Sequence, residues 1–144
     1  MSRSENDDLI PSILRRCHTI AVVGMSASRE RDSYQVARYL QQQGYRIVPV
    51  NPTYAGTAIL GEFCHASLYD AADQLAHDGR HIDMVDCFRR SDAIGPIADA
   101  AIDIGAQCLW MQLGVVNQAA AAKARAAGLQ VVMDRCIKIE HAYR

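Results

Sequence analysis

Gly24 and Ser26 lie where a short apolar run, Thr19 to Val23, gives way to a polar stretch. A buried strand that ends at a glycine and continues through a serine-containing turn into a helix is a common phosphate site in α/β proteins. The glycine lets the backbone turn tightly beside a ligand, and the helix offers unpaired N–H groups and the positive end of its dipole. This stretch predicts a phosphate-bearing ligand.

The residues after the second apolar run argue against an NAD site. NAD-type domains carry G-x-G-x-x-G and, about 20 residues later, an acidic residue that binds the ribose. The second and third glycines are missing after Gly24, and the second run ends at Val50, Asn51 and Pro52 without a carboxylate. We therefore expect a nucleotide other than NAD, and an NAD(P)-type binder is the less favoured alternative.

Other candidates follow the predicted strands, at the edge where open α/β sheets bind ligands. Arg89 follows a buried run, and its guanidinium suits a phosphate. Arg29 and Arg31 lie in a charged loop, where solvation is the commoner role. Trp110 and Met111 are expected to be partly core, and they could also form one wall for a flat ring or a thin chain.

Few residues are arranged for catalysis. The chain has no G-x-S-x-G elbow and no G-x-x-x-x-G-K-[ST] loop, and no histidine is placed with a nucleophile and an acid. Asp86, in a strand-like run, needs hydrogen-bond partners, which favours a structural role. Cys136 is the reactive side chain expected near the cleft, where Arg135 and a following helix could lower its pKa. An inert, half-buried thiol is the alternative, and no catalytic residue is predicted.

Composition excludes several classes of protein. The 144 residues, 50% hydrophobic and 22% charged, suit one soluble domain with its own core. A net charge of −1 gives no field that favours nucleic acid. The apolar runs are too short to span a bilayer, and the N-terminus has no apolar signal-peptide core, so a cytoplasmic protein is expected. Five cysteines without a C-x-x-C pair predict neither a disulfide framework nor a metal site.

Apolar runs and helical patterns alternate along the chain. Strands are predicted at 19–23, 46–50, 84–88, 107–110 and 130–133. Helices are predicted to start near residues 7 or 8, 33, 68, 91, 117 and 137. Pro11 is expected in the first turn of the first helix, and Ser91 and Asn117 are expected to cap the helices that start at their positions. A short extended piece is expected at Ile59 and Leu60. This pattern predicts one α/β domain over 1–144, with residues 1–6 flexible. We expect a five-stranded parallel sheet, in the order 3-2-1-4-5, with helices on both faces.

Five segments, in this order and spacing, resemble the coenzyme A-binding domain family. They are Ala21–Gly24 with Ser26, Gly44–Pro52, Asp83–Arg89, Leu109–Gly114 and Met133–Cys136. The resemblance is to the small stand-alone bacterial branch, related to the N-terminal domain of the succinyl-CoA synthetase α subunit. It covers nearly the whole chain, and it implies a Rossmann-like three-layer sandwich that holds coenzyme A or an acyl-CoA across the strand ends.

The resemblance also implies roles for single residues. The turn after the first strand would hold the phosphates, and Cys136 matches a cysteine of the family. Tyr54 stands where the synthetases use a lysine, so Arg31 or Arg89 is expected to supply that charge. The implied binding residues are Gly24, Met25, Ser26, Arg31, Ser33, Tyr34, Asn51, Pro52, Tyr54, Phe88, Arg89, Trp110, Met111, Gln112 and Cys136.

The expected function is therefore binding without catalysis. The synthetases' second domain, with its phosphorylated histidine, has no counterpart in this sequence, so the resemblance implies binding but not ligation. We expect a sensor or accessory protein for coenzyme A or an acyl-CoA, with no nucleic acid or membrane partner. The protein partner is open, and an enzyme acting on coenzyme A thioesters or thiol through Cys136 is the alternative.

Overall fold

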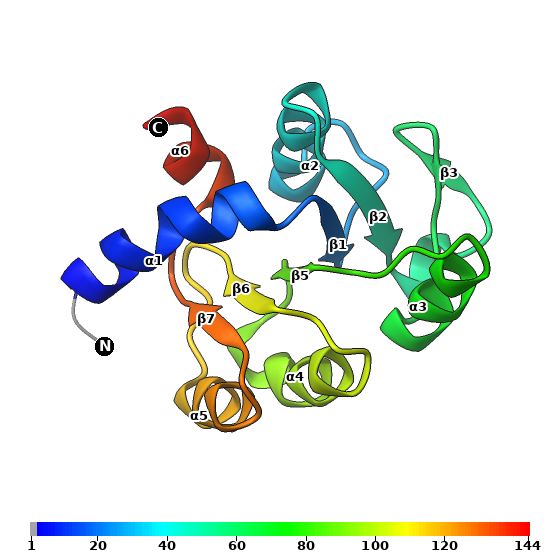
Figure 1. Cartoon of the computed structure of the whole chain (residues 1–144). Helices are drawn as coiled ribbons and strands as arrows, with labels where there is room; N and C mark the ends of the chain where they lie inside the picture. Colours follow the sequence, from blue (N-terminus) through cyan, green and yellow to red (C-terminus); the bar gives the residue numbers. More distant parts are fainter. Residues whose placement is uncertain (1–2) are drawn as a thin grey trace.

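Five short apolar runs form one parallel sheet in the computed structural model, which describes residues 3–144. The strands are β1 (Thr19–Val23), β2 (Arg46–Val50), β5 (Met84–Cys87), β6 (Cys108–Met111) and β7 (Gln130–Val132). One face is covered by α1 (Arg3–Arg16), α2 (Asp32–Gln42) and α6 (Ile137–Ala142), and the other by α3 (Leu68–His77), α4 (Ile94–Asp103) and α5 (Gln118–Ala126) (Figure 1). The predicted Rossmann-like three-layer α/β fold is confirmed.

The two faces of the sheet carry separate cores. Successive residues of a strand point to opposite faces, so in β1 Ile20 and Val22 pack toward α1, α2 and α6. Ala21 and Val23 pack toward α3, α4 and α5. Because both faces are buried, the strands read as continuous apolar runs, which is why they could be located from the sequence.

The order of strands in the sheet is β2-β1-β5-β6-β7. β5, the third parallel strand along the chain, lies beside β1, whereas the order 3-2-1-4-5 placed it outside β2. Pro49 explains the difference, because it has no N–H to donate and proline is confined to edge strands. Its carbonyl accepts from His65 N at 3.0 Å, and Asn51 N donates to His65 O at 2.9 Å, so the segment before α3 covers this edge.

Several expected boundaries shift. α1 begins at Arg3, so Pro11 lies inside the helix instead of in its first turn. Residues 3–6 of the segment expected to be flexible belong to this helix, and residues 1 and 2 lie outside those described.

Asn117 caps α5 as predicted, with its Oδ1 accepting from Ala120 N at 2.9 Å. Ser91 does not cap α4, because it lies in a 3-10 turn and its Oγ accepts from Val116 N at 3.0 Å.

A small hairpin replaces the single extended piece expected near Ile59. β3 (Ala58–Ile59) and β4 (Glu62–Phe63) pair antiparallel around Leu60 and Gly61. Both turn residues have positive φ, 54° at Leu60 and 77° at Gly61, as a two-residue hairpin turn requires. A leucine rarely takes this conformation, so its presence at this position was a weak turn signal. In the part of the chain that the structure describes, no helix is long and apolar enough to cross a membrane.

Candidate functional site

The turn after β1 has no room for a side chain at Gly24. Its φ is 84°, and a Cβ built there would lie 2.6 Å from the Phe88 carbonyl oxygen and 2.9 Å from Cδ of Arg89. Glycine therefore serves here both for its backbone conformation and for the close approach of two strand ends. As a result, the turn after β1 lies directly against Phe88 and Arg89.

Hydrogen bonds fix this turn from both sides. Asn51 Nδ2 donates to the carbonyl oxygen of Met25 at 3.0 Å, which ties the turn to the end of β2. Ser26 N donates to Ser33 Oγ at 2.9 Å, which ties it to the first turn of α2. Ser26 Oγ accepts from Ser28 N at 3.0 Å, so its hydroxyl hydrogen stays available to an acceptor. The structure thus brings Gly24, Ser26, Ser33 and Asn51 together.

The start of α2 offers a second source of donors. Its N-cap residue is Arg31, and among the described residues no side chain caps the helix. The first N–H groups of an uncapped helix, together with its dipole, favour an anion. Arg31 itself is exposed beside this helix start.

A cavity of about 500 Å³ opens at the same edge of the sheet. Its lining residues come from α2, from the ends of β5 and β6, and from α6: Asp32, Gln35, Val36, Phe88, Arg89, Gln112, Leu113, Val115, Cys136, Lys138 and Ile139. The sequence predicted Phe88, Arg89, Gln112 and Cys136 as binding residues, and the structure brings these four to one cavity. Among the described residues that line it, the two cations, Arg89 and Lys138, outnumber the single acidic residue, Asp32.

Trp110 and Met111 do not form a common wall. Both are 0% exposed, and they lie on opposite faces of β6, Trp110 in the core under α1, α2 and α6 and Met111 in the other. The expectation of one shared wall is therefore wrong, because neighbouring residues of a strand point to opposite faces. Trp110 instead donates its indole N–H to the carbonyl oxygen of Arg135 at 2.8 Å and so holds the loop before α6.

Four other predicted residues do not line the cavity. Met25 is fully buried, and its backbone carbonyl is the part bonded to Asn51. Tyr34 and Tyr54 are half-buried and pack against the core under α1, α2 and α6. Pro52 is exposed in the 3-10 turn Pro52–Tyr54, so contact of these residues with a ligand stays a prediction.

Cys136 differs from the other four cysteines. It is half-buried and lines the cavity, whereas the others are buried, and all five are free. Burial raises the pKa of the Cys17 thiol to about 11, with the nearby Asp83 charge adding to the effect. Burial also raises the pKa of Cys87 and Cys108 well above the usual value. Burial raises the pKa of Cys64 as well. These four thiols are poor nucleophiles, so Cys136 is the one placed to react with a ligand.

Asp86 is a buried carboxyl group without partners among the described residues. It is 0% exposed, and neither carboxylate oxygen has a hydrogen-bond partner. The expected partners are therefore absent there, and desolvation raises the pKa of Asp86 well above its usual value. Asp83 differs from Asp86 because its carboxylate has hydrogen-bond partners. Its Oδ2 accepts from the backbone N–H groups of His18 and Thr19 at 2.8 and 2.9 Å. The raised pKa favours the protonated, uncharged carboxyl group, which lessens the cost of an unpaired buried charge.

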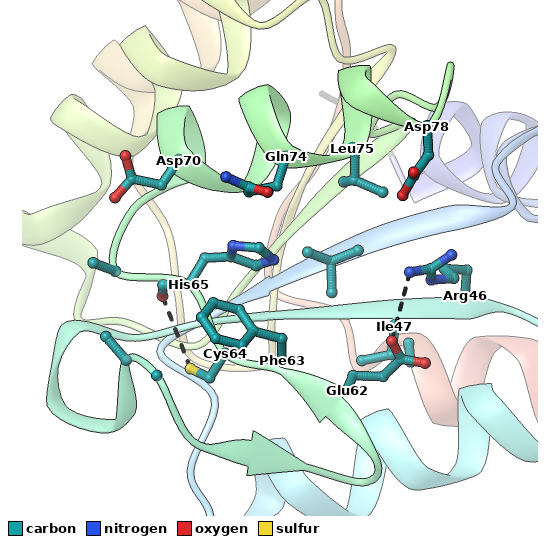
Figure 2. Close-up of a pocket in the computed structure, with 14 residues that line it drawn as sticks. Arg46, Ile47, Glu62, Phe63, Cys64, His65, Asp70, Gln74, Leu75 and Asp78 are labelled. Carbon is teal, nitrogen blue, oxygen red and sulfur yellow. Dashed lines mark hydrogen bonds and ion pairs between the residues drawn. The ribbon is translucent and has the colours of Figure 1, made fainter.

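A second cavity, of about 580 Å³, lies along the outer edge of β2 (Figure 2). Side chains of α3 and of the residue after it, including Asp70, Gln74 and Asp78, face Arg46 and Glu62 across it. Arg46 pairs with Glu62 at 3.6 Å, so the two aspartates leave the lining negatively charged. This cavity could not be predicted from the sequence, because it depends on the hairpin that covers the edge of β2.

Carboxylates repel phosphates, so the cavity at the edge of β2 does not suit the predicted ligand. Of the two cavities, the one at the strand ends has the favourable charge and is lined by four of the predicted residues. Within residues 3–144, no group of three His, Cys, Asp or Glu side chains could hold a metal ion.

The chain is similar to known proteins in sequence and in fold. Residues 18–142 match the model of a family described as "CoA binding domain". The protein YneT of Bacillus subtilis (strain 168) is 39% identical over 133 residues, which cover 92% of each chain. A structure from Thermus thermophilus has 32% identity and a TM-score of 0.85, with 96% of this chain and 97% of that one covered. A protein from Pyrococcus horikoshii OT3 has 36% identity and a TM-score of 0.85, with 95% and 90% covered.

Proposed function

This chain belongs to the CoA binding domain family, and we propose that it binds coenzyme A at the carboxyl ends of its strands, as a sensor or accessory protein without catalysis of its own. The observation that carries the proposal is the close contact between Gly24 and the backbone of Phe88. This contact brings the ends of β1 and β5 together, so the turn after β1 and Arg89 lie side by side at the edge where open α/β sheets bind ligands.

The diphosphate would lie over the turn after β1. Ser26 would donate its hydroxyl hydrogen, and the first N–H groups of α2 would point at the phosphate oxygens. Arg89 would add a charge-assisted hydrogen bond, since its side chain starts beside Gly24. Arg31, exposed at the start of α2, is the second cation within this region.

The pantetheine arm would run from the turn into the cavity at the strand ends. The turn and the cavity are adjacent, because Phe88 and Arg89 lie against Gly24 and also line the cavity. The volume of the cavity, about 500 Å³, falls in the usual range for small-molecule sites, roughly 300–1,000 Å³. Cys136 would then face the thiol end of the ligand.

An NAD(P)-type ligand fits this site less well. Asn51 occupies the place of the acidic residue that would bind the ribose. Its amide is already engaged, with Nδ2 bonded to the carbonyl oxygen of Met25 and Oδ1 accepting from Thr53 N at 3.0 Å. These bonds hold the Asn51 side chain on the turn, and a neutral amide lacks the negative charge of the acidic residue that NAD sites use.

Native mass spectrometry of the protein purified without added ligand tests the proposal. We expect an added mass equal to coenzyme A or an acyl derivative, lost on mild denaturation. A co-purified dinucleotide would contradict the proposal and favour the NAD(P) alternative. If the protein is ligand-free, added coenzyme A should produce a one-to-one complex, and failure to form one would also contradict the proposal.

A further inference from the structure

The cavity at the strand ends is partly lined by apolar side chains that reach solvent. Leu113, on the loop after β6, is 67% exposed, and Ile139, on α6, is 48% exposed. Val115, from the same loop as Leu113, and Val36, from α2, line the same cavity. A single exposed apolar residue needs no explanation, but several around one cavity mark a place where an apolar group binds.

The positive charge on the α6 side of this cavity does not require an anionic group on the ligand. Lys138 lines the cavity, but its ammonium nitrogen lies 5.7 Å from the centroid of the Tyr39 ring, where a cation–π contact stabilises it. The side chain of Arg89 lies beside the turn after β1, where its Cδ approaches Gly24. The apolar part of the lining on the loop after β6 and on α6, which comprises Leu113, Val115 and Ile139, therefore suits an uncharged, apolar group.

We infer that the ligand is a coenzyme A thioester and that Leu113, Val115 and Ile139 hold its acyl group. The inference rests on the proposed function, because the turn at Gly24 must first fix the diphosphate. The arm that leaves this turn enters the cavity past Phe88, and the group at its far end meets the loop after β6 and α6. Gln112, whose Oε1 accepts from Ile137 N at 3.2 Å, keeps its amide N–H groups for the carbonyls of the arm.

Burying one methylene contributes about 0.8 kcal/mol, which corresponds to about a fourfold gain in affinity. Hexanoyl-CoA has four more methylenes than acetyl-CoA, and a partly open cavity buries only some of them. We therefore expect hexanoyl-CoA to bind at least about tenfold more tightly than coenzyme A or acetyl-CoA. A non-hydrolysable thioether analogue should show the same gain.

Titration calorimetry with coenzyme A, acetyl-CoA and hexanoyl-CoA tests the inference. It is carried out on the wild type, Leu113→Ala and Ile139→Ala. Both variants should keep their affinity for coenzyme A within about twofold and lose at least about fivefold for hexanoyl-CoA, since each truncation removes buried methylenes. Val116→Ala is the matched control, because Val116 is 41% exposed on the same loop but does not line the cavity. It should leave both affinities unchanged.

Equal affinities of the wild type for coenzyme A and hexanoyl-CoA would overturn the inference while leaving the proposed function intact. A gain with hexanoyl-CoA that persists in both alanine variants would also overturn it, because the acyl group would then lie elsewhere. If neither ligand binds the wild type, the proposed function fails and the inference fails with it.

Discussion

The indole N–H of Trp110 donates to the backbone carbonyl oxygen of Arg135 at 2.8 Å. This bond joins the end of β6 to the loop that carries Cys136. Two more bonds tie the same loop down, from Gly114 N to Asp134 Oδ1 at 2.7 Å and from Ile137 N to Gln112 Oε1 at 3.2 Å. The half-buried thiol at the cavity is therefore held in place by a side chain that has no exposed surface of its own.

Replacing Trp110 by phenylalanine should loosen this loop. The change leaves the Arg135 carbonyl without its donor, which costs about 1–3 kcal/mol of stability. The reaction of Cys136 with a thiol reagent should speed up in the same variant. Tyr45→Phe is a matched control, since the Tyr45 hydroxyl donates to the Leu14 carbonyl at 2.7 Å away from the cavity. If both variants react at the wild-type rate, Trp110 does not position the loop.

Asp86→Asn should change how stability depends on pH. The folded protein holds the proton of Asp86 at a raised pKa, whereas the unfolded chain releases it near about pH 4. The stability that this proton provides is therefore full below about pH 4 and is lost as pH rises toward the folded pKa, by about 1.4 kcal/mol per pH unit. Asparagine cannot ionise, so the variant should gain stability relative to the wild type as pH rises.

Urea unfolding at a series of pH values between about 4.5 and 8 measures this difference for Asp86→Asn. Asp92→Asn serves as the control, because Asp92 is an exposed carboxylate whose partner, Arg90, is also exposed. A stability difference between Asp86→Asn and the wild type that stays constant with pH would show that Asp86 is ionised in the folded protein.

Arg89→Ala should weaken coenzyme A binding by about 1.5–3 kcal/mol, the usual contribution of a charge-assisted hydrogen bond. Because Arg89 starts beside Gly24, it should meet the diphosphate, so dephospho-coenzyme A should lose the same amount. Arg90→Ala should bind normally, since Arg90 is exposed and pairs with Asp92 at 3.4 Å. A larger loss for coenzyme A than for dephospho-coenzyme A would assign Arg89 to the 3′-phosphate instead.

Cys136 should form a mixed disulfide with coenzyme A disulfide. Its thiolate attacks one sulfur of the reagent, the Cys136–S–S–CoA bond forms, and coenzyme A leaves as a thiolate. Intact-mass analysis should show one adduct, reversed by a reducing agent and absent in Cys136→Ser. The four buried cysteines provide the internal comparison. An adduct that maps to Cys17 or Cys64, or none at all, would mean that the pantetheine end does not reach Cys136.

The positions of the strands could be predicted because each strand is buried on both faces of the sheet and therefore appears in the sequence as a short apolar run. β1 and β2 have the bounds that the sequence indicated, since each is a short apolar run between polar turns and is buried on both faces. The order of the strands was predictable in part. Pro49, in the middle of β2, is the signal that this strand lies at an edge, and the expected order overlooked it.

The site was predicted less completely than the fold. Gly24 and Arg89 could be assigned to the strand ends because each follows an apolar run, and the structure places them in contact. The strand period of two already implied that Trp110 and Met111 point to opposite faces. The apolar lining from Leu113 and Ile139 could not be predicted, because it depends on how the loop after β6 and α6 come together in the folded chain.

The central claim is that the turn at Gly24 and Ser26 binds the diphosphate of coenzyme A. Titration calorimetry of coenzyme A against the wild type and Ser26→Asp tests it most directly, with circular dichroism to confirm that the variant is folded. The wild type should bind one equivalent with a micromolar dissociation constant, about 8 kcal/mol of binding free energy. The folded variant should bind none, because its carboxylate repels the phosphates. Near-normal affinity in folded Ser26→Asp, or tighter wild-type binding of NAD than of coenzyme A, would contradict the claim.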